Sequence, residues 1–392
     1  MSVQRVLVVH NAYQHAGGED SVVADEVALL RRKGHDVVEM RRDNHEITGR
    51  GRAGVALETL WSTRTRRDTL RLLDEQRPDV VHVHNTFPLV SPSLYWACDE
   101  AGVPVVQTLH NFRLACPQAM FLRDGQVCES CLGTTPWPAL RHGCYRGSRA
   151  QTAVVVGMLA LHRGAGTYRR KVSRYIALNE FCRAKFVQAG LPAARIAVKP
   201  NFADIARDPQ ARARARDGLL FVGRLSPEKG VDVLAAAWSQ CKGGTLRVAG
   251  VGPAGAAFAA VGGVSMLGAL SPPQVQAEMR DALALVLPSI WYENFPRTLV
   301  EAFGAGLPVI ASRIGALAEL VEDGVTGLLF EPGDAADLAR VLRWARDNPA
   351  RMAWMGANAR DRFDELYTPD NNYARLIEIY RSAADDRRAI HD

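Results

Sequence analysis

The chain has 392 residues, with 48 Lys and Arg, 42 Asp and Glu, and a formal net charge of +6. Apolar residues make up 47% and charged residues 23%, the proportions of a soluble globular protein. The longest apolar run, Ala153–Leu161, is far shorter than the roughly 20 residues that cross a bilayer, which excludes a membrane-spanning protein. A strand-like segment starts almost at the N-terminus, so we expect no secretory signal and a cytoplasmic protein.

Strand-like and helix-like segments alternate throughout, which is typical of parallel sheets with helical crossovers. In the first half we expect strands at residues 3–9, 36–40, 80–83, 104–109, 175–178 and 196–199. In the second half we expect strands at residues 219–222, 246–248, 264–267, 283–287, 308–311 and 327–330. Ser21–Lys33 has apolar residues at helical spacing and ends at Gly34, so it predicts a helix.

The length and this alternation indicate more than one domain. We expect a first domain at residues 1–200, a linker at 201–217 in an Ala- and Arg-rich stretch, and a second domain at 218–369. Residues 370–392 are expected to form a last helix, with apolar residues at helical spacing. The predicted fold class is α/β, with two doubly wound, Rossmann-like parallel-sheet domains facing each other across a ligand-binding cleft.

Two signals in the first half could belong to a binding site. Gly17 and Gly18 follow the first predicted strand, where glycines let backbone N–H groups approach a phosphate, although taken alone the pair favours a plain tight turn. His110 follows the strand-like segment in T-L-H-N-F, where its side chain would face the cleft. A histidine held only by local backbone groups is the alternative.

Four cysteines lie in a loop-like insertion at about residues 113–148. They are Cys116, Cys128, Cys131 and Cys144. The Cys-x-x-Cys pair and two flanking cysteines suit a tetrahedral, structural zinc site, since a lasting disulfide is disfavoured in a cytosolic chain. Free thiols or a redox pair remain the alternative.

Basic residues are concentrated in the first half of the chain. Residues 1–200 contain 27 Lys and Arg against 18 Asp and Glu, and the remaining residues contain 21 against 24. The apolar Ala153–Leu161 segment, followed by Arg163, Arg169, Arg170 and Lys171, could lie on an anionic membrane surface or form an ordinary buried helix. The arginines are scattered and do not alternate with aromatic residues, so we expect no nucleic acid partner.

The motif F-V-G-R-L-S-P-E-K-G covers residues 221–230 and joins a buried strand to a helix. It places Arg224 and Lys229 in a short loop at the carboxyl end of the strand. A guanidinium gives forked hydrogen bonds and an ammonium gives a point charge, which together suit a pyrophosphate. Taken alone, the two residues could also be ordinary surface cations.

Glu293 and Glu301 stand on either side of a turn that contains Pro296 and leads into a helix. Ligands of open parallel sheets bind beyond the carboxyl ends of the strands, where a helix N-terminus offers N–H groups to an anion. Carboxylates only accept hydrogen bonds and therefore suit sugar hydroxyls. The spacing predicts a site for a ligand that carries both sugar and phosphate.

These motifs, in this order, resemble those of the family 4 retaining glycosyltransferases, which have the GT-B fold. The resemblance extends over nearly the whole chain and includes the glutamate pair with seven residues between its members and the last helix, which in that fold crosses back to the first domain. Asn294 departs from the pattern, because many relatives have glycine after the first glutamate.

The resemblance implies transfer of a sugar from a nucleotide diphosphate sugar to an acceptor hydroxyl, with retention of configuration. Arg224 and Lys229, with the Gly17–Gly18 loop, would neutralise the departing diphosphate. Because no Asp-x-Asp motif stands near the donor loops, these cations are expected to replace a divalent metal, and catalysis is expected to need no cofactor.

The family also implies how the sugar is held. Glu301 would bind the ribose, and Glu293 would bind the donor sugar together with the N–H groups of Asn294 and Phe295. His110 would orient the sugar or the acceptor. A lipid-linked or saccharide acceptor is expected, in bacterial surface polysaccharide or glycolipid synthesis, with the protein cytoplasmic or peripheral on the inner face of the cell membrane.

Two other classes of function remain. A sugar-nucleotide epimerase or hydrolase on the same fold would exchange isotope into the sugar without an acceptor, whereas a transferase requires one. A noncatalytic sugar-nucleotide-binding protein would bind the donor tightly and turn over with no acceptor.

Overall fold

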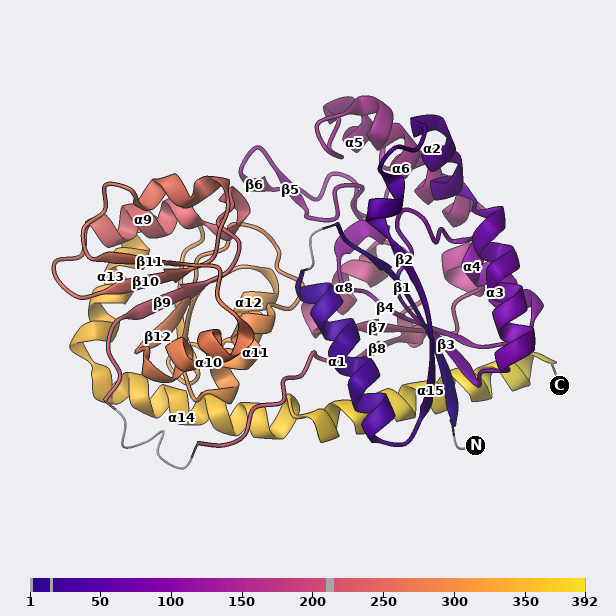
Figure 1. Cartoon of the computed structure of the whole chain (residues 1–392). Coiled ribbons are helices and arrows are strands. Elements are labelled where there is room, and N and C mark those ends of the chain that lie inside the picture. The colour runs from indigo at the N-terminus through magenta and orange to yellow at the C-terminus, as the bar shows by residue number, and fades with distance from the viewer. Residues whose placement is uncertain (1–2, 15–16, 209–214, 392) are drawn as a thin grey trace. The chain divides into compact units, whose positions relative to one another are not determined.

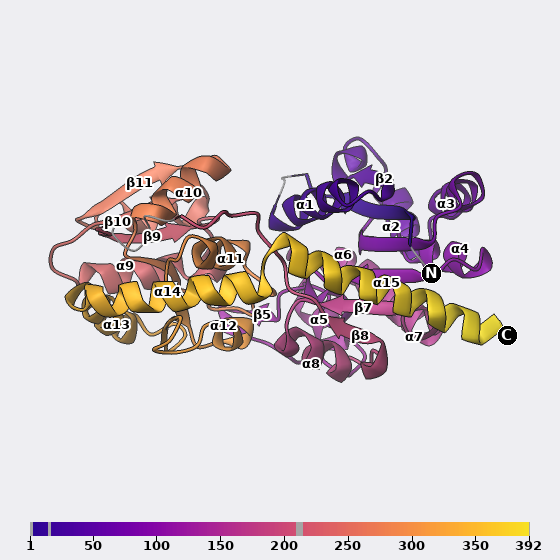
Figure 2. The same ribbon diagram turned by 90° about the horizontal axis from the view of Figure 1, so that it is seen from below.

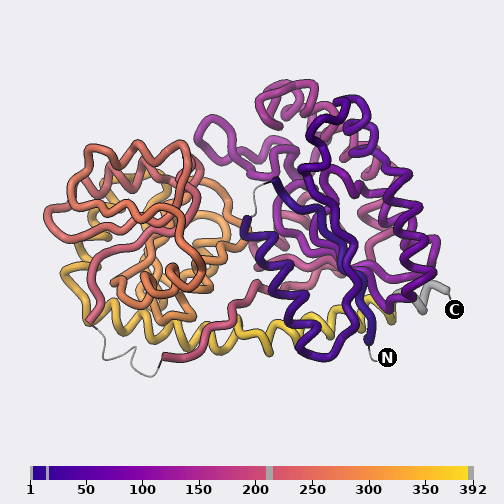
Figure 3. The backbone as a smooth tube through the Cα atoms, viewed as in Figure 1, coloured from indigo at the N-terminus to yellow at the C-terminus, as the bar shows by residue number. Residues whose placement is uncertain are grey.

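The computed structural model describes residues 3–14, 17–208 and 215–391. The described residues divide into two compact units, which Figure 3 lets the reader follow along the chain. The first unit contains the chain up to Met120, then Glu129–Pro200, and the chain from Asn372 onward. The second unit contains Phe121–Cys128 and Asn201–Asn371. The predicted linker at residues 201–217 lies partly outside the described residues, at 209–214.

In the described part of the first unit, six parallel strands form one sheet in the order β2-β1-β3-β4-β7-β8 (Figure 1). Its central strands are nearly continuous apolar runs, because helices cover both faces of a parallel sheet. The order reverses between β1 and β3, which opens a crevice at the carboxyl ends of these strands. The strands are β1 (Arg5–Ala12), β2 (Asp36–Asp43), β3 (Val80–Asn85), β4 (Val105–Thr108), β7 (Arg174–Ala177) and β8 (Ile196–Val198).

The helices of this unit follow the strands in the alternating pattern that the sequence predicts. Helix α1 starts three residues before the predicted Ser21, because the Asp20 carboxylate accepts a hydrogen bond of 2.8 Å from the Gly17 N–H and caps the helix there. The α-helices are α1 (Gly18–Arg32), α2 (Arg52–Leu60), α3 (Thr63–Gln76), α4 (Ser93–Glu100), α5 (Trp137–His142), α6 (Arg149–Gly164), α7 (Thr167–Arg170) and α8 (Glu180–Gln188). Short 3-10 turns are η1 (Asn44–Ile47), η2 (Phe112–Leu114) and η3 (Ala193–Arg195).

The last helix, α15 (Pro369–His391), supplies part of the core of the first unit. Leu376 and Tyr380 are fully buried there among strand residues that include Val6 and Ile176. The helix lies along this unit in both views of the ribbon (Figures 1 and 2). The first unit is therefore assembled from both ends of the chain.

In the second unit, the described residues form another sheet of six parallel strands, in the order β11-β10-β9-β12-β13-β14. Here the order reverses between β9 and β12, so the carboxyl ends of these two strands form the crevice. The strands are β9 (Leu219–Val222), β10 (Leu246–Ala249), β11 (Val264–Gly268), β12 (Ala284–Leu287), β13 (Val309–Ser312) and β14 (Gly327–Phe330). The predicted pair of parallel α/β sheets is thus confirmed.

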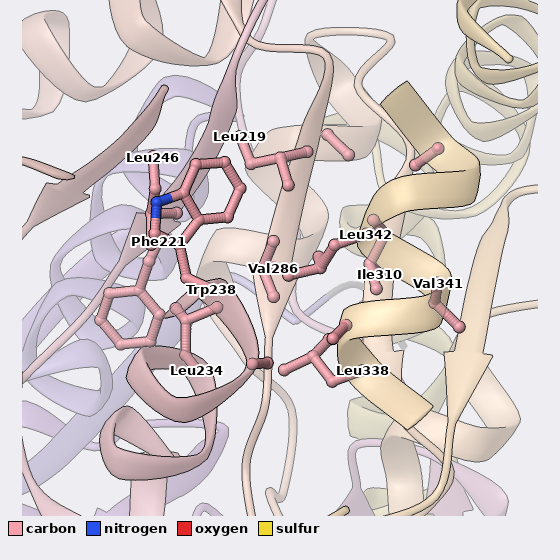
Figure 4. Close-up of a cluster of buried hydrophobic side chains, with 14 of the residues drawn as sticks. Leu219, Phe221, Leu234, Trp238, Leu246, Val286, Ile310, Leu338, Val341 and Leu342 are labelled. Atoms are coloured by element: carbon pink, nitrogen blue, oxygen red, sulfur yellow. The ribbon is translucent and has the colours of Figure 1, made fainter. Parts of the chain in front are cut away.

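The core of the second unit lies between one face of the sheet and helices α9 and α13 (Figure 4). Trp238 of α9 packs against Leu219, Phe221 and Leu246, and its indole N–H donates a hydrogen bond of 3.1 Å to the Gly262 carbonyl. The helices of this unit are α9 (Val231–Ser239), α10 (Pro272–Asp281), α11 (Arg297–Gly304), α12 (Gly315–Leu320), α13 (Ala335–Asp347) and α14 (Pro349–Leu366), with the 3-10 turns η4 (Pro227–Lys229) and η5 (Pro253–Phe258).

A short antiparallel pair, β5 (Leu122–Arg123) and β6 (Gln126–Val127), also belongs to the second unit. The sequence does not predict it, because two-residue strands are too short to show an alternating pattern.

Helix α6 contains the apolar segment Ala153–Leu161. Val155, Val156, Met158 and Leu159 are buried, and Leu161 is 52% exposed, so the segment is mainly a core helix of the first unit. Across residues 3–14, 17–208 and 215–391, every helix is too short or too polar to span a bilayer.

Candidate active site

The candidate site in the second unit is built from the loops that follow β9 and β12. These strands are neighbours in the sheet, so their carboxyl ends lie side by side. The Ile290 N–H donates a hydrogen bond of 3.0 Å to the Glu228 carbonyl and ties the two loops together. Gly230 has a φ of +69°, and a Cβ added there would lie 1.8 Å from the Pro288 carbonyl oxygen. Only glycine permits this approach.

Lys229 and Glu293 meet at this junction. The Lys229 Nζ atom donates a hydrogen bond of 2.7 Å to Glu293 Oε1, and the Ser289 hydroxyl donates another of 2.7 Å to the same oxygen. Glu293 is 6% exposed, and Lys229 lies 5.5 Å from the ring centre of Trp291. Burial of Glu293 and the contacts with Ser289 and Trp291 therefore hold the Lys229–Glu293 pair in a fixed position.

Arg224 forms a second ion pair in the same loop. Its guanidinium donates hydrogen bonds to Glu228 and, at 3.2 Å, to the Ser226 hydroxyl, and its side chain is 66% exposed. Burial alone would raise the pKa of Glu228, but hydrogen bonds from Ser226, from the backbone and from Arg224 outweigh it and lower that pKa. A charged Glu228 thus orients the exposed cation. We call Arg224, Ser226, Glu228, Lys229, Ser289 and Glu293 the donor cluster.

The other predicted residues of this unit lie around the start of α11. Glu301 accepts a hydrogen bond of 2.7 Å from Arg297, one helical turn before it. Phe295 is buried and its ring centre lies 5.9 Å from that of Tyr367, while Asn294 is partly exposed. Glu293 and Glu301 therefore have different cationic partners, Lys229 and Arg297.

In the first unit, Gly17 and Gly18 are exposed at the N-terminus of α1, directly after the β1 crevice. Glu19 connects them to the segment after β4. Its Oε2 atom accepts a hydrogen bond of 2.9 Å from the Tyr13 hydroxyl and one of 3.4 Å from the Asn111 amide. The diglycine turn and the residue next to His110 are thus linked through one carboxyl group.

The pKa of Glu19 is raised to about 8, mainly because burial disfavours its charged form. A neutral Glu19 adds no further negative charge beside Gly17 and Gly18, whereas an ionised Glu19 would repel a phosphate group. The Gly17 N–H itself is already donated to the Asp20 carboxylate.

Glu19 is expected to make stability fall with rising pH. The folded-state pKa of about 8 lies above the ordinary value of 4.5, so the contribution is fully present below 4.5 and is lost as the pH rises through about 8. Replacing Glu19 by Gln should therefore raise the free energy of unfolding most near pH 8. Urea unfolding near pH 4.5 and near pH 8 measures this, with Glu75→Gln on the exposed face of α3 as a charge-matched control. A Glu19→Gln effect that does not change with pH would contradict it.

The predicted His110 belongs to a buried group in the first unit. Its Nε2 atom lies 2.9 Å from His84 Nδ1, and the two rings stack with centres 5.2 Å apart. Beyond His84 lie Glu26, His82 and Lys199, and the Lys199 ammonium donates a hydrogen bond of 2.7 Å to Glu26 Oε2. We call these five residues the histidine cluster.

Burial controls the protonation of this cluster. It lowers the pKa of His110 to about 3, and His10, His82 and Lys199 add to this while Glu26 opposes it. It also holds the pKa of His84 well below the ordinary range. Burial would raise the pKa of Glu26, but Lys199 and His82 outweigh it and keep that pKa well below its usual value. At neutral pH the cluster therefore holds a carboxylate and two neutral imidazoles.

The structure divides the four predicted zinc ligands between the units. Cys131 and Cys144 pack around Ala139 in a small apolar cluster, and Cys116 belongs to the same unit. Cys128 follows β6 and belongs to the second unit. Among described His, Cys, Asp and Glu side chains, the group whose ligand atoms lie within 4.8 Å of one another is Glu26, His82 and His84. The zinc site stays a prediction, which elemental analysis of protein purified without added metal will test.

Sequence reasoning missed several members of both clusters. Ser226 and Glu228 lie inside the motif that contains Arg224. As the acidic residue of that loop, Glu228 is a partner for Arg224 that the sequence itself indicates. Glu26 falls between Val23 and Val27 on the apolar stripe of α1, where a charge signals a buried partner. That partner, Lys199, could not be identified from its position alone.

Two parallel α/β units, each with a reversal of strand order at the centre of its sheet, define a GT-B fold. Solved structures of this class cover nearly the whole chain. The HepE protein of Anabaena in complex with UDP has a TM-score of 0.68 and 20% identity, and covers 97% of this chain and 100% of that one. Sucrose-phosphate synthase of Thermosynechococcus elongatus has a TM-score of 0.72 and 19% identity, and covers 96% and 98%.

Sequence comparison identifies the family. Residues 16–207 match the model described as Glycosyltransferase Family 4, and residues 216–348 match that of Glycosyl transferases group 1. The D-inositol 3-phosphate glycosyltransferase of Thermomonospora curvata is 31% identical over 332 residues, which cover 78% of this chain and 72% of that protein. The chain belongs to the family 4 glycosyltransferases.

Other relatives are matched over less of their length. The D-inositol 3-phosphate glycosyltransferase of Streptomyces avermitilis is 34% identical over 342 residues, 79% of this chain and 66% of that protein. A glycogen synthase of Mycobacterium tuberculosis is 34% identical over 204 residues, 48% of this chain and 49% of that protein. The chain thus spans between about half and two thirds of these two relatives.

Proposed function

We propose that this protein is a retaining glycosyltransferase that moves a sugar from a nucleotide diphosphate sugar to an acceptor hydroxyl. The observation that carries the proposal is the Lys229–Glu293 pair, held at 2.7 Å where β9 and β12 end side by side. It places a cation for phosphate next to an acceptor for sugar hydroxyls. Binding of UDP by HepE and of UDP-glucose in a further complex of that protein supports a nucleotide-sugar donor.

In this proposal the donor cluster carries the chemistry. The Lys229 ammonium has three donors, so it can keep its bond to Glu293 and still donate to the leaving diphosphate. Arg224 is more exposed and gives a forked contact to the same group. Glu293 accepts from the donor sugar, with the N–H groups of Asn294 and Phe295 beside it, and Glu301 accepts from the ribose.

The acceptor hydroxyl attacks from the side of the leaving group and passes its proton to a diphosphate oxygen. Arg224 and Lys229 stabilise the charge that builds up there, and no divalent metal is required. His110 orients the sugar or the acceptor. Rates that fall with a metal chelator would contradict the metal-independent part of the proposal.

Product stereochemistry tests the reaction directly. NMR of the anomeric proton should show the configuration of the donor retained in the product, and clean inversion would refute the mechanism. Strict dependence on an acceptor is expected, and isotope exchange into the sugar without one would favour an epimerase or hydrolase. Tight donor binding without turnover for any acceptor would favour a noncatalytic role.

We further propose a lipid-linked or saccharide acceptor, met at the inner face of the cell membrane. Residues 130–179 contain eight Lys and Arg and no Asp or Glu. In this stretch, exposed basic residues accompany two exposed apolar side chains, Trp137 on α5 and Leu161 on α6, at 64% and 52% exposure. Exposed apolar groups among cations favour an anionic lipid surface.

Vesicle sedimentation is expected to show this preference. The protein should bind phosphatidylglycerol vesicles more strongly than phosphatidylcholine vesicles, and salt should weaken the binding because it screens the charges. Trp137→Ser with Leu161→Ser should reduce it, whereas Trp354→Ser, at a residue with 44% exposure on α14, is the matched control. Equal binding to both vesicle types would contradict membrane association by charge.

A further inference from the structure

The histidine cluster contains a row of three groups that ends at His110. The Nε2 atom of His84 faces Glu26 Oε1 at 3.5 Å, and the Nδ1 atom of His84 faces His110 Nε2 at 2.9 Å. His84 and Glu26 are 4% and 2% exposed, so water does not reach the space between them. The row runs from α1 through β3 to His110, the second residue after β4.

A neutral imidazole carries one N–H, so His84 has two alternative arrangements. If its Nδ1 carried the proton, its Nε2 lone pair would point at the buried Glu26 carboxylate. If its Nε2 carries the proton, that N–H points at the carboxylate and Nδ1 accepts a hydrogen bond from the Nε2–H of His110. The second arrangement is favoured, because it replaces a repulsion between lone pairs with an attraction in a buried, weakly screened environment.

Several side chains hold the Glu26 carboxylate in place, and this carboxylate determines which nitrogen of His84 carries the proton. Its second oxygen accepts the hydrogen bond from Lys199, and Lys199 also donates one of 3.1 Å to Asn372 of α15. His82 Nδ1 lies 3.0 Å from Glu26 Oε1 and 2.7 Å from the Tyr380 hydroxyl. Glu26 is thus a charged carboxylate paired with Lys199, which follows β8, and with His82 of β3. Asn372 and Tyr380 of α15 contact these two partners in turn.

We propose that Glu26, acting through His84, holds His110 in its Nε2–H tautomer and so leaves the Nδ1 atom of His110 as a hydrogen-bond acceptor. Glu26 and His84 are then positioning residues. An accepting Nδ1 recognises a hydroxyl group of the sugar or acceptor, and it cannot donate to a phosphate oxygen. For neutral rings the tautomer follows from the geometry, while the identity of the hydroxyl rests on the proposed function.

The same residues also resemble a metal site, since Glu26, His82 and His84 converge. The ion pair with Lys199 argues against it, because a dication here would add two positive charges to a buried group whose carboxylate is already neutralised. A metal would also take the Nε2 lone pair of His84, which the proposal requires to be protonated. The two possibilities therefore make opposite predictions.

NMR of the full chain with histidine labelled at its ring nitrogens distinguishes the tautomers, because the protonated and unprotonated nitrogens of a neutral ring differ in shift. His84 and His110 should both be Nε2–H at neutral pH. His162 is the internal reference, since its Nε2 lies 2.9 Å from the Leu60 carbonyl and must donate to it. Finding His110 as Nδ1–H or protonated would overturn the proposal, as would shifts of His82 and His84 on adding cobalt.

Removing the buried charge of Glu26 should allow His110 to adopt either tautomer. Glu26→Leu with Lys199→Met replaces the ion pair by apolar groups and leaves no unpaired charge. In this variant His110 should become a mixture of tautomers, while Tyr380→Phe, which changes only the hydroxyl beside His82, should leave it as Nε2–H. An unchanged His110 in the folded double variant would overturn the proposal. If that variant does not fold, the wild-type spectrum alone decides.

Turnover gives a second readout. The amide of Asn reaches the position of Nδ1 and can accept there, whereas the amide of Gln reaches the position of Nε2. His110→Asn should therefore retain at least about tenfold more activity than His110→Gln, a factor that corresponds to about one hydrogen bond. The reverse order would overturn the accepting role of Nδ1. No turnover in the wild type with any donor would count against the proposed function, and the tautomer measurement would still stand.

Discussion

Replacing Lys229 by Ala is expected to slow sugar transfer by about 10²–10³-fold. Removing one preorganised donor from transition-state charge costs about 2.7–4 kcal/mol, and Lys229 is held by Glu293 and Ser289 at the end of β9 before any ligand arrives. The expected loss is in kcat as well as in kcat/KM, because the additional negative charge on the departing diphosphate develops only as the sugar–oxygen bond breaks. Initial rates with a nucleotide-sugar donor measure it.

Lys242→Ala is the matched control for this experiment. Lys242 is an exposed lysine of the same unit, so its removal changes the net charge equally and should leave the rate unchanged. Circular dichroism of both variants checks that they fold, because Lys229→Ala leaves the buried Glu293 without its cation. A folded Lys229→Ala variant with the wild-type rate would be incompatible with the donor cluster as a diphosphate site.

Replacing Gly230 by Ala is expected to lower the free energy of unfolding by roughly 2–5 kcal/mol. The positive φ of +69° costs an ordinary residue about 1–2 kcal/mol, and the added Cβ would lie 1.8 Å from the Pro288 carbonyl oxygen. Overpacking of this kind costs typically about 1–3 kcal/mol. Because the added Cβ would collide with a backbone atom, the collision is relieved only if the loops after β9 and β12 move apart. Urea unfolding followed by tryptophan fluorescence measures the change.

Gly243→Ala separates the cost of the positive φ from the cost of the Cβ collision. Gly243 has a φ of +70°, but an added Cβ there would meet only the Arg346 guanidinium, at 3.6 Å. It should therefore show the backbone cost alone and a smaller shift of the unfolding midpoint. Gly230→Ala should also reduce donor binding, since Lys229 is its neighbour, whereas Gly243→Ala should not. Equal midpoints for the two variants would show that the close approach to Pro288 is not rigid.

The strands were the most predictable part of the fold. Most strands of both sheets contain short, buried apolar runs bounded by loop residues, so their positions follow from the sequence, although β2 and the edge strand β11 are partly exposed. The start of α1 was misplaced, because a side chain three residues along, Asp20, caps the helix at Gly17. The β5–β6 pair was missed because its strands have two residues each.

Contacts within the site were less predictable than its residues. Two separate motifs identified Lys229 and Glu293, but these residues are 64 positions apart, and their pairing depends on β9 lying next to β12. Glu26 and Lys199 are 173 positions apart and meet only because α1 packs beside the end of β8. Sequence patterns locate elements, while strand order decides which distant side chains meet.

The packing of α15 has a consequence for synthesis on the ribosome. Leu376 and Tyr380 complete a core that otherwise consists of residues from the beginning of the chain, including Val6 and Val8 of β1. Asn372 and Tyr380 also complete the polar contacts around Lys199 and His82. A nascent chain that has not yet released these residues leaves the apolar face of its first sheet uncovered. The core of the first unit is therefore completed only after the end of the chain has been synthesised, and the apolar residues that α15 covers are exposed to aggregation until then.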